Sequence, residues 1–137
     1  MNDTIFAVIG YVAWVLILLL ALASYRTIWS KINKRTSLKF DASGSDVSEF
    51  GQRLTRAHAN CYESAVFVVG PMLLAIASDS MAITNGLAYV MLGARILQSA
   101  VHMFSTVNAA ISIRFVLFLV QFAISAYWLG MLAIKFA

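Results

Sequence analysis

The chain has 137 residues, 61% of them hydrophobic and 12% charged, with a formal net charge of +4. Soluble domains carry about 25% charged residues, so a soluble domain of this size is excluded and lipid is the expected solvent. The single cysteine, Cys61, leaves no intrachain disulfide framework. Because no internal repeat or composition change divides the chain, we expect one integral membrane domain over residues 1–137.

The first apolar run, residues 5–24, is 20 residues long and uncharged, which is the length needed to cross about 30 Å of hydrocarbon. Tyr25, Arg26 and Trp29 follow it, as is typical of a membrane interface. We therefore predict a membrane helix over residues 5–29. The N-terminus has no basic segment typical of a signal peptide, so this helix is expected to be retained.

A polar, basic loop over residues 31–51 separates the first two apolar runs. An excess of lysine and arginine is typical of cytoplasmic loops of membrane proteins, and its position here argues against a nucleic-acid site. We therefore expect the loop on the cytoplasmic side and both termini on the opposite side. Seven of the ten basic residues lie between the two runs: Arg26, Lys31, Lys34, Arg35, Lys39, Arg53 and Arg56.

Three further helices are expected, over residues 47–78, 81–105 and 110–136. Asp46 and Glu49 have the spacing of a capping box and place the start of the second helix near Asp46. Pro71 lies inside that helix, which a membrane helix tolerates when neighbours satisfy the freed carbonyl. The fold class predicted from these elements is an all-α membrane protein, a bundle of four transmembrane helices.

Polar residues gather in the half of the bundle next to the basic loop. On the second helix, Arg56, Asn60 and Glu63 lie on one face. On the third helix, Arg95, Gln98, Ser99 and His102 share a face, and Arg114 lies in the first turns of the fourth. Ionisable residues inside a membrane are costly and usually mark a functional interior, so we expect these three helices to form a polar site.

Structural readings of the same residues remain open. Glu63 and Arg95 lie at matching depth and are predicted to form an ion pair between helices, with or without a ligand. Arg114 is either an interface anchor or a cation that lowers the pKa of a thiol. The spacing of His58 and His102 predicts no metal site, and Cys61 is interpreted as a small core residue.

The segment Arg56-Ala57-His58-Ala59-Asn60-Cys61-Tyr62-Glu63 resembles the R-A-x-x-N-x-x-E signature of the MAPEG family, the membrane-associated proteins in eicosanoid and glutathione metabolism. Arg95 with residues at +3 and +7 is similar to the third helix of that family, and Arg114 to its fourth-helix arginine. Gln98 and His102 depart from the residues common at those two positions. The Arg95–Arg114 spacing is also longer than in the eicosanoid-forming synthases, so no particular eicosanoid reaction is favoured.

The resemblance implies a homotrimer that binds glutathione between subunits, on the cytoplasmic side, without a metal. It points to a microsomal-type glutathione transferase that acts on hydrophobic electrophiles from the bilayer. An accessory glutathione peroxidase activity is also implied. In this reading Arg114 stabilises the thiolate and Glu63 binds the α-amino group, while His58 reaches the ligand of a neighbouring subunit. The implied glutathione-binding residues are Arg56, Asn60, Glu63, Gln98, His102 and His58, with Arg26 or Lys31.

Two other functions compete with this one. A non-catalytic protein that binds or presents lipid is the main alternative, and absence of glutathione binding would favour it. A small structural subunit is the other, in which the charges only hold helices together.

Overall fold

The computed structural model describes residues 2–37 and 39–137. Within them the chain forms helices and no strand: α1 (Asp3–Ile32), α2 (Glu49–Glu63), α3 (Ala65–Ala77), α4 (Met81–Phe104) and α5 (Asn108–Phe136). Because α2 and α3 follow each other in one span, the described chain has four segments long and apolar enough to cross a membrane. The predicted class, an all-α four-span membrane protein, is confirmed.

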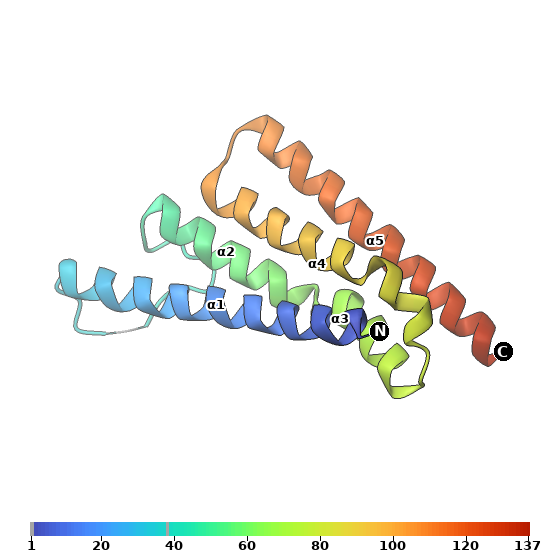
Figure 1. Ribbon diagram of the computed structural model, residues 1–137. Helices are drawn as coiled ribbons and strands as arrows, with labels where there is room; N and C mark the ends of the chain where they lie inside the picture. Colours follow the sequence, from blue (N-terminus) through green and yellow to red (C-terminus); the bar gives the residue numbers. More distant parts are fainter. Residues whose placement is uncertain (1, 38) are drawn as a thin grey trace.

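The spans run in alternating directions, so the two termini and the α3–α4 turn lie toward one end (Figure 1). At that end the hydroxyls of Thr4 and Thr84 are 2.7 Å apart, and Lys135 Nζ donates to Ser80 Oγ at 2.7 Å. At the other end, which carries the basic loop, Arg53 Nε donates to the Met103 carbonyl at 2.8 Å. These contacts fasten the spans to one another at both ends.

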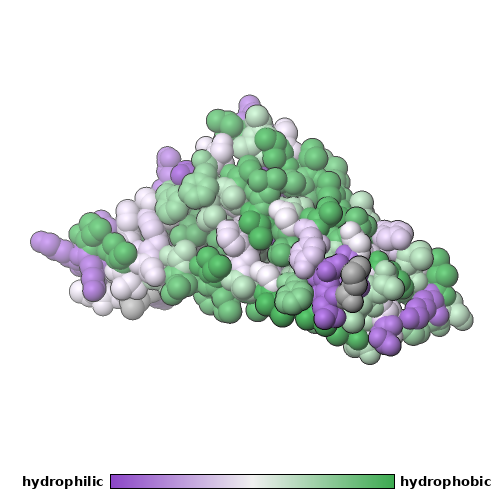
Figure 2. All heavy atoms as spheres, viewed as in Figure 1, coloured by the Kyte–Doolittle hydropathy of each residue, from purple (hydrophilic) through white to green (hydrophobic). Residues whose placement is uncertain are grey.

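The core consists of two apolar clusters that follow the length of the bundle. One joins α1, α3, α4 and α5 around Tyr11, Met72 and Trp128, and the other joins α1, α2 and α4 around Leu18, Leu54 and Met103. Large apolar side chains also cover the outside of the spans, including Leu20, which is 69% exposed. Figure 2 shows this apolar surface, with hydrophilic residues concentrated toward the ends. Lipid is the solvent that such a surface requires.

The second predicted helix differs from the observed one in two ways. The observed helix starts two residues later, at Glu49, because Ser48 is the N-cap and its hydroxyl accepts from the Gly51 N–H at 3.2 Å. Asp46, predicted as the cap, instead binds Arg35. The helix is also divided at Ser64 into α2 and α3.

Hydroxyl groups explain the break at Ser64. The Cys61 carbonyl, which a continuous helix would pair with the N–H of Ala65, accepts hydrogen bonds from Tyr11 Oη and from Ser64 Oγ. Ser64 Oγ also donates to the Asn60 carbonyl at 2.6 Å. Serine competes with the helical ladder in this way, and Tyr11 fixes the break against α1.

Pro71 lies inside α3, and α5 accommodates it. Pro71 lacks an N–H, so the carbonyl of Phe67, four residues earlier, loses its helical partner. Ser125 Oγ of α5 donates to that carbonyl at 2.7 Å. A neighbouring helix therefore satisfies the freed group, as the hydrocarbon environment demands.

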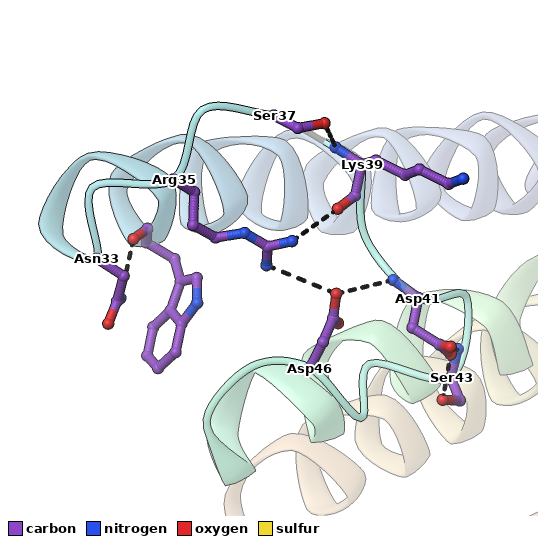
Figure 3. A network of polar contacts seen from close by, with 8 residues as sticks. Asn33, Arg35, Ser37, Lys39, Asp41, Ser43 and Asp46 are labelled. Atoms are coloured by element: carbon purple, nitrogen blue, oxygen red, sulfur yellow. Dashed lines mark hydrogen bonds and ion pairs between the residues drawn. The ribbon is translucent and has the colours of Figure 1, made fainter.

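Polar contacts join the residues of the basic loop to one another (Figure 3). Arg35 lies 3.6 Å from the Asp46 carboxylate and donates to the Lys39 carbonyl at 2.9 Å. Its guanidinium also lies over the Phe40 ring, 4.5 Å from the centroid, and Arg26 lies over the same ring at 5.3 Å. Beside it, hydrogen bonds from Ser43 hold the pKa of the Asp41 carboxyl below its usual value.

We expect Ser125→Ala to lower the free energy of unfolding in detergent by about 1–2 kcal/mol, because it leaves the buried Phe67 carbonyl unsatisfied. In a Pro71→Ala background the new N–H supplies the partner, so the same substitution should cost less than about 0.5 kcal/mol. Circular dichroism during denaturant titration measures both. Equal losses in the two backgrounds would contradict this account of the proline.

Candidate functional site

A small polar pocket lies where α2, α3, α4 and α5 meet. It has a volume of about 170 Å³ and is lined by Asn60, Glu63, Ser64, Phe67, Arg95 and Phe118. Ser64, where α2 ends and α3 begins, lines this pocket. Asn60 in the last turn of α2 contacts Arg95 of α4. The pocket brings three of the predicted polar residues, Asn60, Glu63 and Arg95, to one place. We call it the arginine pocket.

Arg95 is the most deeply buried charge of this pocket, with 1% of its surface exposed. Its Nη1 donates to Asn60 Oδ1 at 2.6 Å, while its Nε is buried without a hydrogen-bond partner in the described chain. A guanidinium has five N–H donors and cannot lose its charge. The pocket therefore holds a cation with unused hydrogen-bonding capacity.

The expected ion pair between Glu63 and Arg95 is replaced by a different contact. Among the described residues, ion pairs within 4.0 Å are Arg35–Asp46 and Arg53–Glu49. Arg95 binds the neutral Asn60, and Glu63 lines the same pocket with an exposed side chain. The carboxylate of Glu63 is thus free to meet a ligand at the mouth of the pocket.

Gln98 and Arg114 are joined across α4 and α5. Gln98 is 7% exposed, and its Nε2 donates to the Arg114 carbonyl at 3.2 Å. Its Oε1 accepts from Gln121 Nε2 at 2.8 Å. The amide of Gln98, predicted to contact glutathione, therefore faces α5.

Two arginines and a histidine lie toward the basic end of the bundle. Arg56 is exposed, and His102 and Arg114 are half-buried. They belong to the parts of α2, α4 and α5 on the side of the basic loop and the α4–α5 turn. Arg114 Nε is buried and has no partner among the described atoms. The two arginines are suited to an anionic ligand.

Arg26 and His58 belong to a second pocket, between α1 and α2 under the basic loop, which we call the His58 pocket. It has a volume of about 240 Å³. The centroid of the His58 ring lies 5.3 Å from that of the Tyr62 ring. Lys31 is exposed near the end of α1 and is not among the residues that line this pocket. The residues that line the His58 pocket are Leu19, Leu22, Arg26, Ala42, Thr55, His58, Ala59 and Tyr62.

The two pockets lie on different faces of α2. Asn60 and Glu63 project from one face, and His58 and Tyr62 from a face about 150° away, at 100° per residue. They share no lining residue. One copy of the chain therefore presents two separate polar surfaces.

Two residues absent from the sequence-based prediction contribute to this region. Gln121 is fully buried in α5 and binds Gln98, and Ser125 lies one turn further along and binds Phe67. A polar side chain in an otherwise apolar span was the signal for both. Cys61 is buried in the core as predicted, with its Sγ 3.0 Å from Ser99 Oγ.

Comparison with known families gives one result. The model of the MAPEG family matches residues 4–134, which is nearly the whole chain. No curated protein and no solved structure matches the chain.

The Asn60–Arg95 contact predicts an asymmetric effect of substitution, measured without ligand. Asn60→Leu should lower the free energy of unfolding by about 2–3 kcal/mol, because it leaves the buried guanidinium without its oxygen acceptor. Arg95→Met in the same chain removes the charge and should recover at least half of that loss. Denaturant titration of the two single variants and the double variant gives the coupling. Additive losses would show that the two side chains do not depend on each other.

Proposed function

The chain belongs to the MAPEG family of membrane proteins in eicosanoid and glutathione metabolism, and on this basis we propose that it is a membrane-bound glutathione transferase. The observation that carries the proposal is the arginine pocket, in which Asn60 and Glu63 of α2 meet Arg95 of α4 between membrane spans. Substrates are hydrophobic electrophiles drawn from the bilayer. Reduction of hydroperoxides by glutathione is proposed as an accessory activity.

The charges around the pocket complement glutathione. At neutral pH this tripeptide carries two carboxylates, one ammonium and a thiol. Arg56 and Asn60 supply donors for carboxylate oxygens, and the exposed Glu63 carboxylate supplies an acceptor for the ammonium. Hydrogen bonds to charged groups contribute about 1.5–3 kcal/mol each, so a few such contacts account for selective binding of a small polar ligand.

A binding site between copies unites the two polar faces of α2. Since the arginine pocket and the His58 pocket open on different faces, a ligand that touches both sets of residues lies between two subunits. We propose the homotrimer that the family resemblance implies, with His58 and Arg26 or Lys31 of one copy facing Glu63 of the next. The free charge of Arg26, outside any ion pair of the described residues, suits a second glutathione carboxylate.

Arg114 is proposed to stabilise the thiolate. Its guanidinium is half-buried near the start of α5, and its Nε has no partner among the described residues. A nearby cation in a site shielded from water favours the thiolate over the thiol. The thiolate sulfur then attacks the electrophilic carbon and forms the C–S bond, and the leaving group departs with the bonding pair. The thiol proton passes to water at the cytoplasmic face.

The orientation follows from the basic loop. We propose that this loop and the α4–α5 turn lie in the cytoplasm, with both termini on the other side. Glutathione then enters from the cytoplasm, and the electrophile arrives from the lipid along a groove between the first span and the last span of adjacent subunits. The polar residues lie in the half of the spans that this arrangement requires.

The alternative function, lipid binding without catalysis, has one observation in its favour. An apolar groove of about 480 Å³ runs between α1 and α3 and is lined by Tyr11, Val15, Val66 and Leu73 among others. A lipid chain fits such a surface. Calorimetry with glutathione separates the two functions, since a lipid-presenting protein would give no heat of glutathione binding.

Arg114→Ala should reduce kcat/KM for conjugation of chlorodinitrobenzene in detergent by about a hundredfold or more, the usual cost of losing one stabilising donor at a developing or held anion. Lys135→Ala is the matched control, because it removes a cation from the opposite end of the same helix. The control should retain wild-type activity. Undiminished turnover by Arg114→Ala would remove that residue from the mechanism.

Glu63→Gln should weaken glutathione binding by about tenfold to a hundredfold, the equivalent of one charged hydrogen bond. A glutathione analogue that lacks the α-amino group should bind the wild type and Glu63→Gln with equal affinity, because the lost partner is then missing from both. Calorimetry with the two ligands measures the difference. Equal weakening for both ligands would assign Glu63 a structural role.

A further inference from the structure

We infer that Gln121 is a positioning residue for Arg114, acting through Gln98. The inference rests on the proposed function, since it concerns the residue to which thiolate stabilisation is assigned. Gln121 lies two helical turns after Arg114 on the same face of α5. It touches neither the arginine pocket nor the His58 pocket.

Burial makes the position of Gln121 informative. Its side chain is fully buried in a stretch of α5 that is otherwise apolar and uncharged from Phe115 to Ile134. A buried amide costs free energy unless it is hydrogen-bonded. Gln121 Nε2 donates to Gln98 Oε1 at 2.8 Å and to the Leu117 carbonyl at 3.0 Å. Both of its N–H groups thus have acceptors, while its Oε1 is buried without a donor among the described residues.

The orientation of both amides follows from the two ends of this chain of hydrogen bonds. The Leu117 carbonyl only accepts, so Gln121 must turn its NH₂ group toward Leu117 and Gln98. Gln98 must then present its oxygen to Gln121, which leaves its own NH₂ group for the Arg114 carbonyl at 3.2 Å. Gln121 and the Arg114 carbonyl therefore hold the Gln98 amide in one orientation from its two ends.

The hydrogen bond from Gln98 to the Arg114 carbonyl ties the α5 backbone to α4 at Arg114. Arg114 is the residue whose guanidinium is proposed to hold the thiolate, so its position matters. Arg114 has no hydrogen bond to Nε among the described residues, although that atom is buried. Its guanidinium is therefore placed by the backbone and by packing. Without Gln121, Gln98 Oε1 loses its donor, and the Gln98 amide is held only by its bond to the Arg114 carbonyl. The link between α4 and α5 at Arg114 is then weaker. A displacement of about 1 Å can cost about a hundredfold in rate.

A structural role alone would make the amide pair a simple link between helices. Ser125 provides the matched control, because it lies one turn beyond Gln121 on the same face and also hydrogen-bonds a neighbouring helix, at the Phe67 carbonyl. Ser125→Ala removes an interhelical bond of similar kind and leaves Arg114 untouched. A merely structural effect would be the same in both variants.

The experiment titrates the ultraviolet absorbance of bound glutathione thiolate against pH in purified wild type, Gln121→Leu and Ser125→Ala. We expect Gln121→Leu to shift the thiolate titration to higher pH and to lower kcat/KM below that titration by about tenfold, within the range that misplacement produces. Glutathione KM should change less than about threefold, because the binding residues of α2 remain in place. Ser125→Ala should not shift the titration.

Gln98→Leu should reproduce the effect, and the double variant should be no worse than either single variant, because both residues act through one chain of bonds. If Gln121→Leu does not fold, Gln121→Asn keeps an amide that is too short to reach, and the same shift is expected. An unshifted titration in these variants, or equal shifts in Ser125→Ala, would overturn the inference alone. A wild type without thiolate absorbance would overturn the proposed function as well.

Discussion

The structure depends on one constraint: within the hydrocarbon of a bilayer, a polar group without a hydrogen-bond partner inside the protein is costly. Three such needs shape the bundle. Pro71 frees a carbonyl that Ser125 satisfies from α5, Tyr11 of α1 binds the carbonyl at the break before α3, and Gln121 binds Gln98 across α4 and α5. Each irregular or polar feature thus creates a link between spans, and the links converge on the segment that carries the arginine pocket.

The spans themselves could be predicted from length and hydropathy, because a stretch of about 20 apolar residues has few alternatives to a membrane helix. The break at Ser64 could not. A serine after Glu63 is compatible with a continuous helix, and the competing donor, Tyr11, is 50 residues away in sequence. The start of α2 was also misplaced, because both Asp46 and Ser48 are good caps and only the tertiary contact of Asp46 with Arg35 decides between them.

The site was predictable as a set of faces and not as a set of pairs. Helical spacing places Asn60 with Glu63, and Arg95 with Gln98, on inward faces. It does not say which side chains meet across helices. Arg95 binds Asn60 rather than Glu63, and Gln98 faces α5, where its partner Gln121 is a single amide in an apolar run. Interhelical partners depend on rotation and depth of each helix, which periodicity leaves open.

This difference in partners bears on function. Had Glu63 paired with Arg95, the two charges would have satisfied each other, and the pocket would be explained as a link between helices. Because a neutral amide holds the guanidinium instead, the carboxylate stays exposed and the cation keeps unused donors. Both remain available to a ligand with charges of both signs. The His58 pocket, on another face of α2, adds a second set of such groups that one copy alone does not bring to the first. A ligand bound between copies is the arrangement that uses both faces.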